Sequence, residues 1–172
     1  MKRMVADFKV GKATEKFRLL ALLAGITIVS NNVLAANYTA RQTGNWNGYG
    51  VWQKNRTTTF TTMDNATINR NYTITVNTAV NTGNVTLSAG TLNVNNPLST
   101  SGTFTISGGT LNVNSPITAN GNFTYSGGSI AIAANSSISV KGNLIVNSDL
   151  TIDNHYDISN VTGIQVANGK TL

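Results

Sequence analysis

Apolar and polar residues alternate in short runs along most of the chain, and these runs recur at a fixed interval. In the run that begins at Gly102, one Thr separates Phe104 from Ile106 and one Asn separates Leu111 from Val113. A period of two residues predicts β-strands with one buried and one exposed face. Ser, Asn and Gly separate the runs at equivalent offsets, as turns require.

The pattern returns about every 19 residues from residue 64 onward, which is typical of stacked-repeat architectures. Units 83–98, 102–117 and 121–132 show it best, and looser copies begin at residues 64, 142 and 161. A third short strand is expected in each unit after the paired runs. Its inward residues would be Leu98, Ile117, and the pair Ile138 and Val140.

Two architectures fit short strands that alternate with Gly-rich turns. An antiparallel sandwich does not require similar residues at a fixed interval, whereas a parallel coil does, because equivalent residues stack on one another. The repeat therefore favours an all-β fold, a right-handed parallel β-helix (β-solenoid) with rungs of about 19 residues. Val85, Phe104 and Phe123 should then lie in one vertical file.

The N-terminus has the three parts of a secretory signal peptide. A basic stretch leads to the apolar residues 19–29, and Val33-Leu34-Ala35 offers a cleavage site after Ala35, with Ala36 as the next choice. A membrane anchor is disfavoured because this apolar run is well short of the roughly 20 residues that span a bilayer. We expect a signal-peptide helix in residues 1–35, export to the extracellular space or outer-membrane surface, and no membrane span in the mature chain.

Charge and cysteine content add little that points to a partner. The net charge is +6, but half of the twelve Lys and Arg residues precede residue 36, and the others are too dispersed for a nucleic-acid-binding stripe. The chain has no Cys. An exported domain without disulfides needs another source of stability, and stacking of repeats is one.

Residues 36–63 do not follow the repeat and contain both Trp residues of the chain, Trp46 and Trp52. Large aromatic side chains ahead of the first rung predict a cap that shields the open end of the solenoid core. The alternative is a carbohydrate-binding platform, for which the two Trp rings would have to be exposed.

This entry region resembles the beginning of exported bacterial β-helix proteins of the autotransporter-passenger and haemagglutinin-like adhesin type. The motifs that carry the resemblance are Gly44-x-Trp46, Trp52, Asp64-x-x-x-Ile68 and Tyr72-x-Ile74-x-Val76. The resemblance implies a surface or extracellular protein that adheres or acts as a scaffold. Such proteins are usually far longer, and rungs 64–172 stop within a unit. We therefore expect a C-terminally truncated fragment, or a last rung covered by a partner or by another copy end to end.

Residues that could support catalysis are few. Four carboxylates follow residue 35, namely Asp64, Asp149, Asp153 and Asp157. Asp149 and Asp153 would lie about 13 Å apart along one strand, beyond the spacing of catalytic carboxylate pairs. A Ca²⁺ ion between Asp153 and Asp157 is an alternative to a solvated turn. His155, the only His, is expected on the surface. The sequence predicts no enzyme, no metal and no cofactor.

Outward-facing polar residues should form columns along the solenoid. The expected columns are Asn84, Thr103 and Asn122; Thr86, Thr105 and Thr124; Thr91, Thr110 and Ser129; and Asn93 with Asn112. These columns either stabilise the stack by hydrogen bonds between rungs or display a flat array that binds a ligand. The first two columns are the candidate binding ladder. A glycan or a host surface protein is the expected partner. Ice is less favoured because only unit 102–120 has two Thr on one strand face.

These features predict a surface-exposed or secreted adhesin-like module that is structural or binding in function. The alternative is a non-catalytic fragment of a β-helix protein that binds or degrades polysaccharide. A third interpretation is a structural remnant without a ligand. A polysaccharide-degrading relative would carry clustered Asp residues in rungs beyond those present here.

Overall fold

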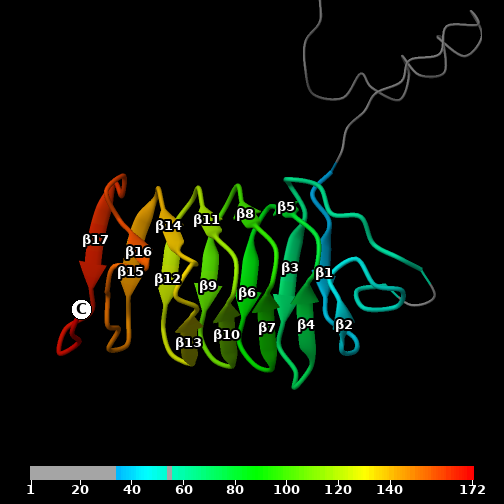
Figure 1. The fold of residues 1–172 in the computed structure, drawn as a ribbon, viewed down its shortest axis with the longest axis horizontal. Coiled ribbons are helices and arrows are strands. Elements are labelled where there is room, and N and C mark those ends of the chain that lie inside the picture. The colour runs from blue at the N-terminus through cyan, green and yellow to red at the C-terminus, as the bar shows by residue number, and fades with distance from the viewer. Residues whose placement is uncertain (1–33, 54–55) are drawn as a thin grey trace, which may run out of the picture. The chain divides into compact units, whose positions relative to one another are not determined.

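The computed structural model describes residues 34–53 and 56–172. The expected signal-peptide helix lies outside these residues. The described chain is all-β, with seventeen strands and no helix, so it contains no helix that could cross a membrane. The strands stack into successive rungs along the long axis of the domain (Figure 1).

The strands form three sheets. Sheet A has seven strands in the spatial order β1 (Asn37–Thr39), β3 (Asn65–Ile68), β6 (Val85–Leu87), β9 (Phe104–Ile106), β12 (Phe123–Tyr125), β15 (Asn143–Val146) and β17 (Gly163–Val166). Sheet B has five, namely β2 (Gly44–Asn45), β4 (Thr73–Val76), β7 (Thr91–Val94), β10 (Thr110–Val113) and β13 (Ser129–Ile132). Sheet C has five, namely β5 (Val80–Thr82), β8 (Leu98–Thr100), β11 (Ile117–Ala119), β14 (Ile138–Val140) and β16 (Tyr156–Asp157).

Every strand pairing in the described residues is parallel, and none joins strands that are consecutive in the chain. Val85 pairs with Phe104, and Phe104 pairs with Phe123, which confirms the expected vertical file. The parallel β-solenoid is therefore confirmed, and the antiparallel sandwich is excluded. The right-handedness of the coil stays a prediction.

Rung length is almost constant through the middle of the domain. Hydrogen bonds join Asn84 to Thr103 across 19 positions, and Asn122 to Asn143 across 21. The longer lap includes the extended turn between β13 and β14. The first lap is longer still, because Asn37 contacts Asn65 across 28 positions. The repeat is thus regular only where its turns are short.

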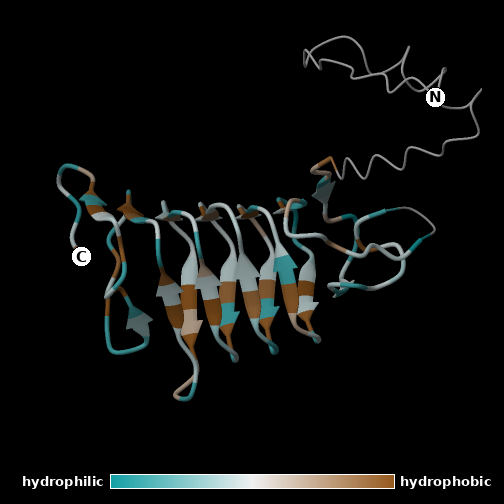
Figure 2. Cartoon of the chain, turned by 90° about the horizontal axis from the view of Figure 1, so that it is seen from above, coloured by the Kyte–Doolittle hydropathy of each residue, from teal (hydrophilic) through white to brown (hydrophobic). Residues whose placement is uncertain are grey.

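The core follows from the alternation of inward and outward residues. Inward side chains from the three sheets form one continuous buried cluster, visible as apolar bands on the strands (Figure 2). The rings of Phe104 and Phe123 stack at a centroid distance of 5.7 Å. Two buried polar residues interrupt the apolar core at equivalent positions of sheet C, Thr82 and Thr100, which pair with each other.

The entry region holds two strands and an aromatic cluster. β1 and β2 pair with β3 and β4, so the parallel sheets begin before residue 64. Trp46 and Trp52 are buried, with ring centroids 4.9 Å apart, and both rings contact Phe60. The Trp52 indole N–H donates to the Trp46 carbonyl. The carbohydrate platform of exposed Trp rings is wrong, because neither ring is accessible to a sugar.

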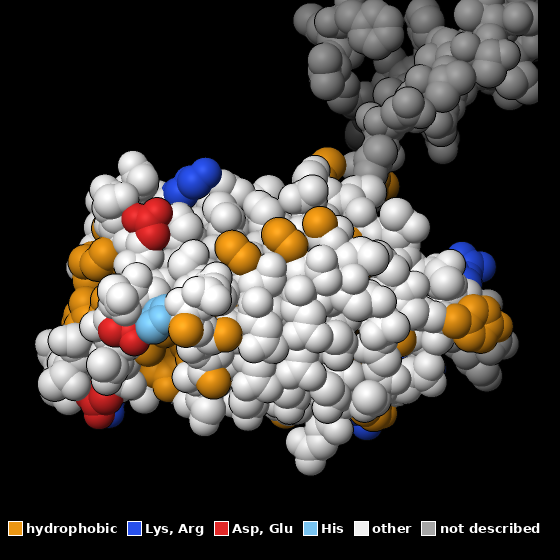
Figure 3. Space-filling view, in the orientation of Figure 1, with side chains coloured by type: hydrophobic (Ala, Val, Ile, Leu, Met, Phe, Trp, Pro, Cys, Tyr) orange, Lys and Arg blue, Asp and Glu red, His pale blue; other side chains and the backbone are white. Residues whose placement is uncertain are grey.

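The opposite end of the described domain is apolar. Ile164 and Val166 of β17 pair with the core residues Leu144 and Val146, yet they are 45% and 40% exposed. Apolar side chains gather at this end of the molecule (Figure 3). The expected truncation or end-to-end contact at this end stays a prediction.

Glycine is required where the turns between sheets A and B stack closely. Gly109 has a φ of 75°, and a Cβ added to it would lie 2.6 Å from the Gly90 carbonyl oxygen. Because this oxygen belongs to the backbone of the previous rung, the clash has no easy relief. Gly169 has a similar φ of 72°, but a Cβ added there would meet no atom within 4 Å.

The two glycines share a positive φ, but only Gly109 lies against the backbone of the neighbouring rung, so substitutions at both positions separate the effect of strain from that of close contact. We expect Gly109→Ala to lower the free energy of unfolding by about 3 kcal/mol, because it adds a backbone clash to the strain of a positive φ. Gly169→Ala should cost about 1 kcal/mol, the strain alone. Urea denaturation followed by circular dichroism measures both. Equal losses in the two variants would contradict close stacking of the turns.

Candidate functional site

The most regular surface feature of the described residues is a column of five threonines on sheet A. Register pairs Thr39 with Thr67, Thr67 with Thr86, Thr86 with Thr105, and Thr105 with Thr124. We call this set the threonine column. It contains the three threonines predicted from sequence and extends them by two rungs. Ile145 and Gln165 occupy the two positions that follow.

A parallel column of asparagines lies two residues earlier on the same face. It contains Asn37, Asn65, Asn84, Thr103, Asn122 and Asn143, and we call it the asparagine column. The Asn65 Oδ1 accepts the Asn84 backbone N–H at 2.9 Å, and the Asn84 Oδ1 accepts the Thr103 N–H at 2.6 Å. Asn122 does the same for Asn143 at 2.9 Å. These side chains therefore tie successive rungs together.

The two columns differ in their hydrogen bonding. Adjacent rungs lie about 4.8 Å apart, which is too far for direct bonds between short hydroxyl side chains. An Asn side chain is longer and carries both a donor and an acceptor, so it can bridge the gap. The structure gives the hydroxyls of Thr67, Thr86, Thr105 and Thr124 no partner among residues 34–53 and 56–172. These hydroxyls remain free for water or a ligand.

The face that carries both columns is uncharged. Its outward positions from β1 to β17 hold Asn, Thr, Ile, Gly and Gln only. The threonines of the three central strands are partly buried, between fully buried neighbours on each strand.

Sheet B repeats this arrangement on a smaller scale. Thr91, Thr110 and Ser129 are in register, as the sequence predicted. Asn112 donates its side-chain amide to Asn93 Oδ1 at 2.8 Å. The Asn residues thus stabilise the stack on both sheets, and the expectation of hydrogen bonds along the columns is confirmed for Asn.

A single substitution tests the role of the asparagine column. Asn84→Ala removes the acceptor for the Thr103 N–H, and we expect a loss of about 1 kcal/mol in the free energy of unfolding. The matched control is Thr86→Ala in the same rung, which removes a hydroxyl that has no partner in residues 34–53 and 56–172. Its loss should be smaller. Equal losses would show that the Asn bonds add nothing.

The reverse substitution gives an independent prediction. The structure gives no acceptor for the Asn122 backbone N–H among the described residues, because Thr103 interrupts the column. Thr103→Asn would supply an Oδ1 at that point. We expect thermal denaturation to show a stabilised protein, by about 0.5–1 kcal/mol. No gain in stability would contradict the proposed geometry of the column.

The carboxylates near the end of the described chain each accept hydrogen bonds from nearby residues. Hydrogen bonds from the Thr171 backbone N–H and hydroxyl lower the pKa of Asp149. The His155 backbone N–H lowers the pKa of Asp153, and the Ser159 hydroxyl lowers that of Asp157. In the described part of the chain, no three His, Cys, Asp or Glu side chains group together as metal ligands would.

Two neighbours of these carboxylates complete this region. His155 Nδ1 lies 3.0 Å from Asp153 Oδ1, and the His side chain is 24% exposed. Burial raises the pKa of Tyr156 to about 12, with further contributions from Asp153 and Tyr125. The tyrosine is therefore protonated at neutral pH and packs as part of the end of the core.

Asp64 has a structural position at the entry of the solenoid. It is 4% exposed, and its two carboxylate oxygens accept the backbone N–H groups of Ala36 and Thr61 at 2.8 and 2.7 Å. Burial raises the pKa of Asp64, but the bonds from Ala36 and Thr61 outweigh burial and lower it overall. Its carbonyl accepts the Thr82 hydroxyl at 2.6 Å. Asp64 thus links the residue before β1 to the segment before β3 and to the end of β5.

Because the pKa of Asp64 is lowered in the folded protein, its carboxylate stabilises the fold above the unfolded pKa, and this stability is lost as the pH falls through the folded pKa. We expect Asp64→Asn to lower the free energy of unfolding at pH 7 by about 2 kcal/mol. The variant should also lose less stability than the parent between about pH 5 and pH 2. Urea titrations of the parent and the variant across this range measure both effects. An unchanged pH profile would contradict the assignment.

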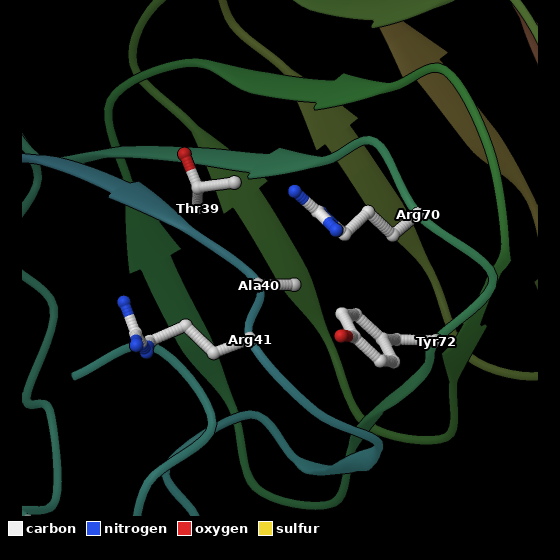
Figure 4. Close-up of a pocket in the computed structure, with 5 residues that line it drawn as sticks. All are labelled: Thr39, Ala40, Arg41, Arg70 and Tyr72. Carbon is white, nitrogen blue, oxygen red and sulfur yellow. The ribbon is translucent and has the colours of Figure 1, made fainter. Parts of the chain in front are cut away.

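Two pockets of about 330 Å³ each flank the entry region. The first is lined by Thr39, Ala40, Arg41, Arg70 and Tyr72 (Figure 4). The second lies between the segment that follows the aromatic cluster and β5, and is lined by Asn47, Thr59, Phe60, Thr61, Thr62, Ala79, Val80 and Asn81. The first pocket is the one that contains charged side chains.

Comparison of this chain with protein-family models, with curated proteins and with solved structures gave no match. The β-helix part of the expected resemblance therefore rests on the observed fold. Its autotransporter-passenger and adhesin part rests on the sequence motifs alone.

Sequence reasoning missed part of the surface that it singled out. The triplet Asn-x-Thr marks the same two outward positions of sheet A in four rungs, at 37–39, 65–67, 84–86 and 122–124. It also occurs at 55–57, 71–73 and 160–162, and Thr73 lies on sheet B, so the triplet identifies the columns only together with the strand pattern. This signal would have extended both columns towards the N-terminus. Arg41, Arg70 and Tyr72 left no such signal, because they come from turns of two different rungs.

Proposed function

We propose that this protein is an exported, surface-exposed binding module of the adhesin type, which uses the threonine column to bind a glycan without catalysing a reaction. The observation that carries the proposal is the register of five threonines, of which the four on the inner strands have hydroxyls without a partner among the residues that the structure describes. The three-part pattern of residues 1–35 supports export.

A glycan fits this face better than a folded protein does. A hydroxyl both donates and accepts hydrogen bonds, and sugars present hydroxyls of the same kind. Energetically important residues at protein interfaces are mostly Trp, Tyr and Arg, which fill pockets. The outward positions of sheet A hold none of these. Repeated weak contacts along several rungs would add up along an extended chain.

Lysine substitutions on three consecutive rungs test the proposal. The variant Thr86→Lys, Thr105→Lys, Thr124→Lys places bulky charges on the threonine column, and we expect its affinity for glycans bound by the parent to fall by about tenfold or more. A glycan array identifies the ligands, and isothermal titration calorimetry measures the affinities.

The matched control lies on sheet C, whose outward column contains Asn81, Ser99 and Thr118 in register. Replacing these three with Lys adds the same number of charges at the same rung spacing. It also removes the hydrogen bond that Asn120 Nδ2 donates to Ser99 Oγ, so circular dichroism must show that both lysine variants are folded. Its glycan affinity should stay within about twofold of the parent. Unchanged binding in the folded sheet A variant would overturn the proposal. Release of reducing ends from a bound glycan would support the polysaccharide-degrading alternative instead.

A further inference from the structure

A positively charged pocket lies at the first rung, where the threonine column begins. Thr39, the first member of the column, also lines the pocket of about 330 Å³ together with Ala40, Arg41, Arg70 and Tyr72. Ala40 is 2% exposed, so it belongs to the solid floor of the pocket. The pocket and the uncharged face are therefore parts of one continuous surface.

The charged and aromatic side chains of the pocket come from turns that join sheets A and B. Arg70 extends from the turn after β3 across Ala40 towards Thr39, and the Tyr72 ring lies beside Ala40 (Figure 4). Arg41 follows β1, and its side chain extends away from Ala40, on the side opposite to Arg70 and Tyr72 (Figure 4). One guanidinium, one aromatic ring and one hydroxyl thus surround a buried floor.

Both arginines lack a carboxylate partner in the part of the chain that the structure describes. The contact between a basic side chain and a carboxylate found there joins His155 to Asp153, far along the chain. Asp64 is engaged by the backbone of Ala36 and Thr61. Two positive charges without a counter-charge raise the local concentration of anions, and a guanidinium offers paired N–H donors to a carboxylate or a sulfate.

We propose that this pocket binds an anionic sugar residue, so that the glycan ligand of the threonine column is an acidic polysaccharide. The Arg70 guanidinium pairs with the carboxylate or sulfate of the sugar, and the Tyr72 ring packs against the apolar face of the sugar ring. Thr39 supplies a hydroxyl on the side that leads to the threonine column. The inference rests on the proposed function and adds the charge class of the ligand.

Three hexasaccharides of equal length test the inference by calorimetry on the full exported protein. Oligogalacturonate carries carboxylates, a heparin fragment carries sulfates as well, and maltohexaose is neutral. We expect the parent to bind at least one acidic hexasaccharide about tenfold or more tightly than maltohexaose, with an affinity that falls as salt increases. Comparison of the two acidic probes shows which anionic group the pocket prefers.

Arginine substitutions locate the effect. Arg70→Gln and the double variant Arg41→Gln, Arg70→Gln should remove the preference for acidic hexasaccharides and leave maltohexaose binding within about twofold. Lys141→Gln is the control, because Lys141 is an exposed cation at the opposite corner between sheets C and A. Circular dichroism checks that each variant is folded. An unchanged acidic preference in the double variant would overturn the inference.

The failures of the two proposals are distinguishable. If maltohexaose and the acidic probes bind the parent equally, and the sheet A lysine variant loses all of them, the threonine column binds glycans and the proposal of an anionic sugar in the pocket is wrong. If galacturonate alone shifts the NMR signals of residues 39–41 and 70–72 while the sheet A lysine variant binds hexasaccharides normally, the pocket is supported and the column is wrong. Absence of binding by every probe overturns both.

Discussion

The parallel hydrogen bonds between one lap of the backbone and the next are the interaction on which the structure depends. Each lap must close after nearly the same number of residues, so that its strands lie in register with those below. This condition places like residues over like residues, inside and outside. It also brings the turn backbones so close that Gly109 has no room for a side chain. Core, turns and surface columns follow from the same constraint.

The regular part of the fold could be predicted from sequence because the constraint acts on every lap alike. Phe104 and Phe123 occupy the same offset in their units, and the structure stacks their rings. The entry region could not be predicted in this way. Its first rung is 28 residues long, which departs from the 19-residue period, and its strands β1 and β2 are short. The burial of the Trp residues depended on packing against Phe60, which no repeat encodes.

The candidate site was predicted in part for the same reason. The columns of sheet A follow from the repeat, but their division of roles depends on side-chain length. Asn84 reaches the next rung and Thr86 does not, so one column holds the stack together and the other leaves its hydroxyls available. The positively charged pocket could not be foreseen, because Arg41 and Arg70 come from the turns of two different rungs.

The threonine column has a further consequence for any long ligand. Its members are chemically identical and evenly spaced. A polymer whose own repeat matches this spacing could therefore shift by one rung and form the same hydrogen bonds with the next set of threonines. Several alignments would then have equal energy, and their number would itself favour association. Such a surface selects for periodicity more than for a particular end or branch. A distinct group at one end of the row, such as Arg70, is what would make one alignment preferred.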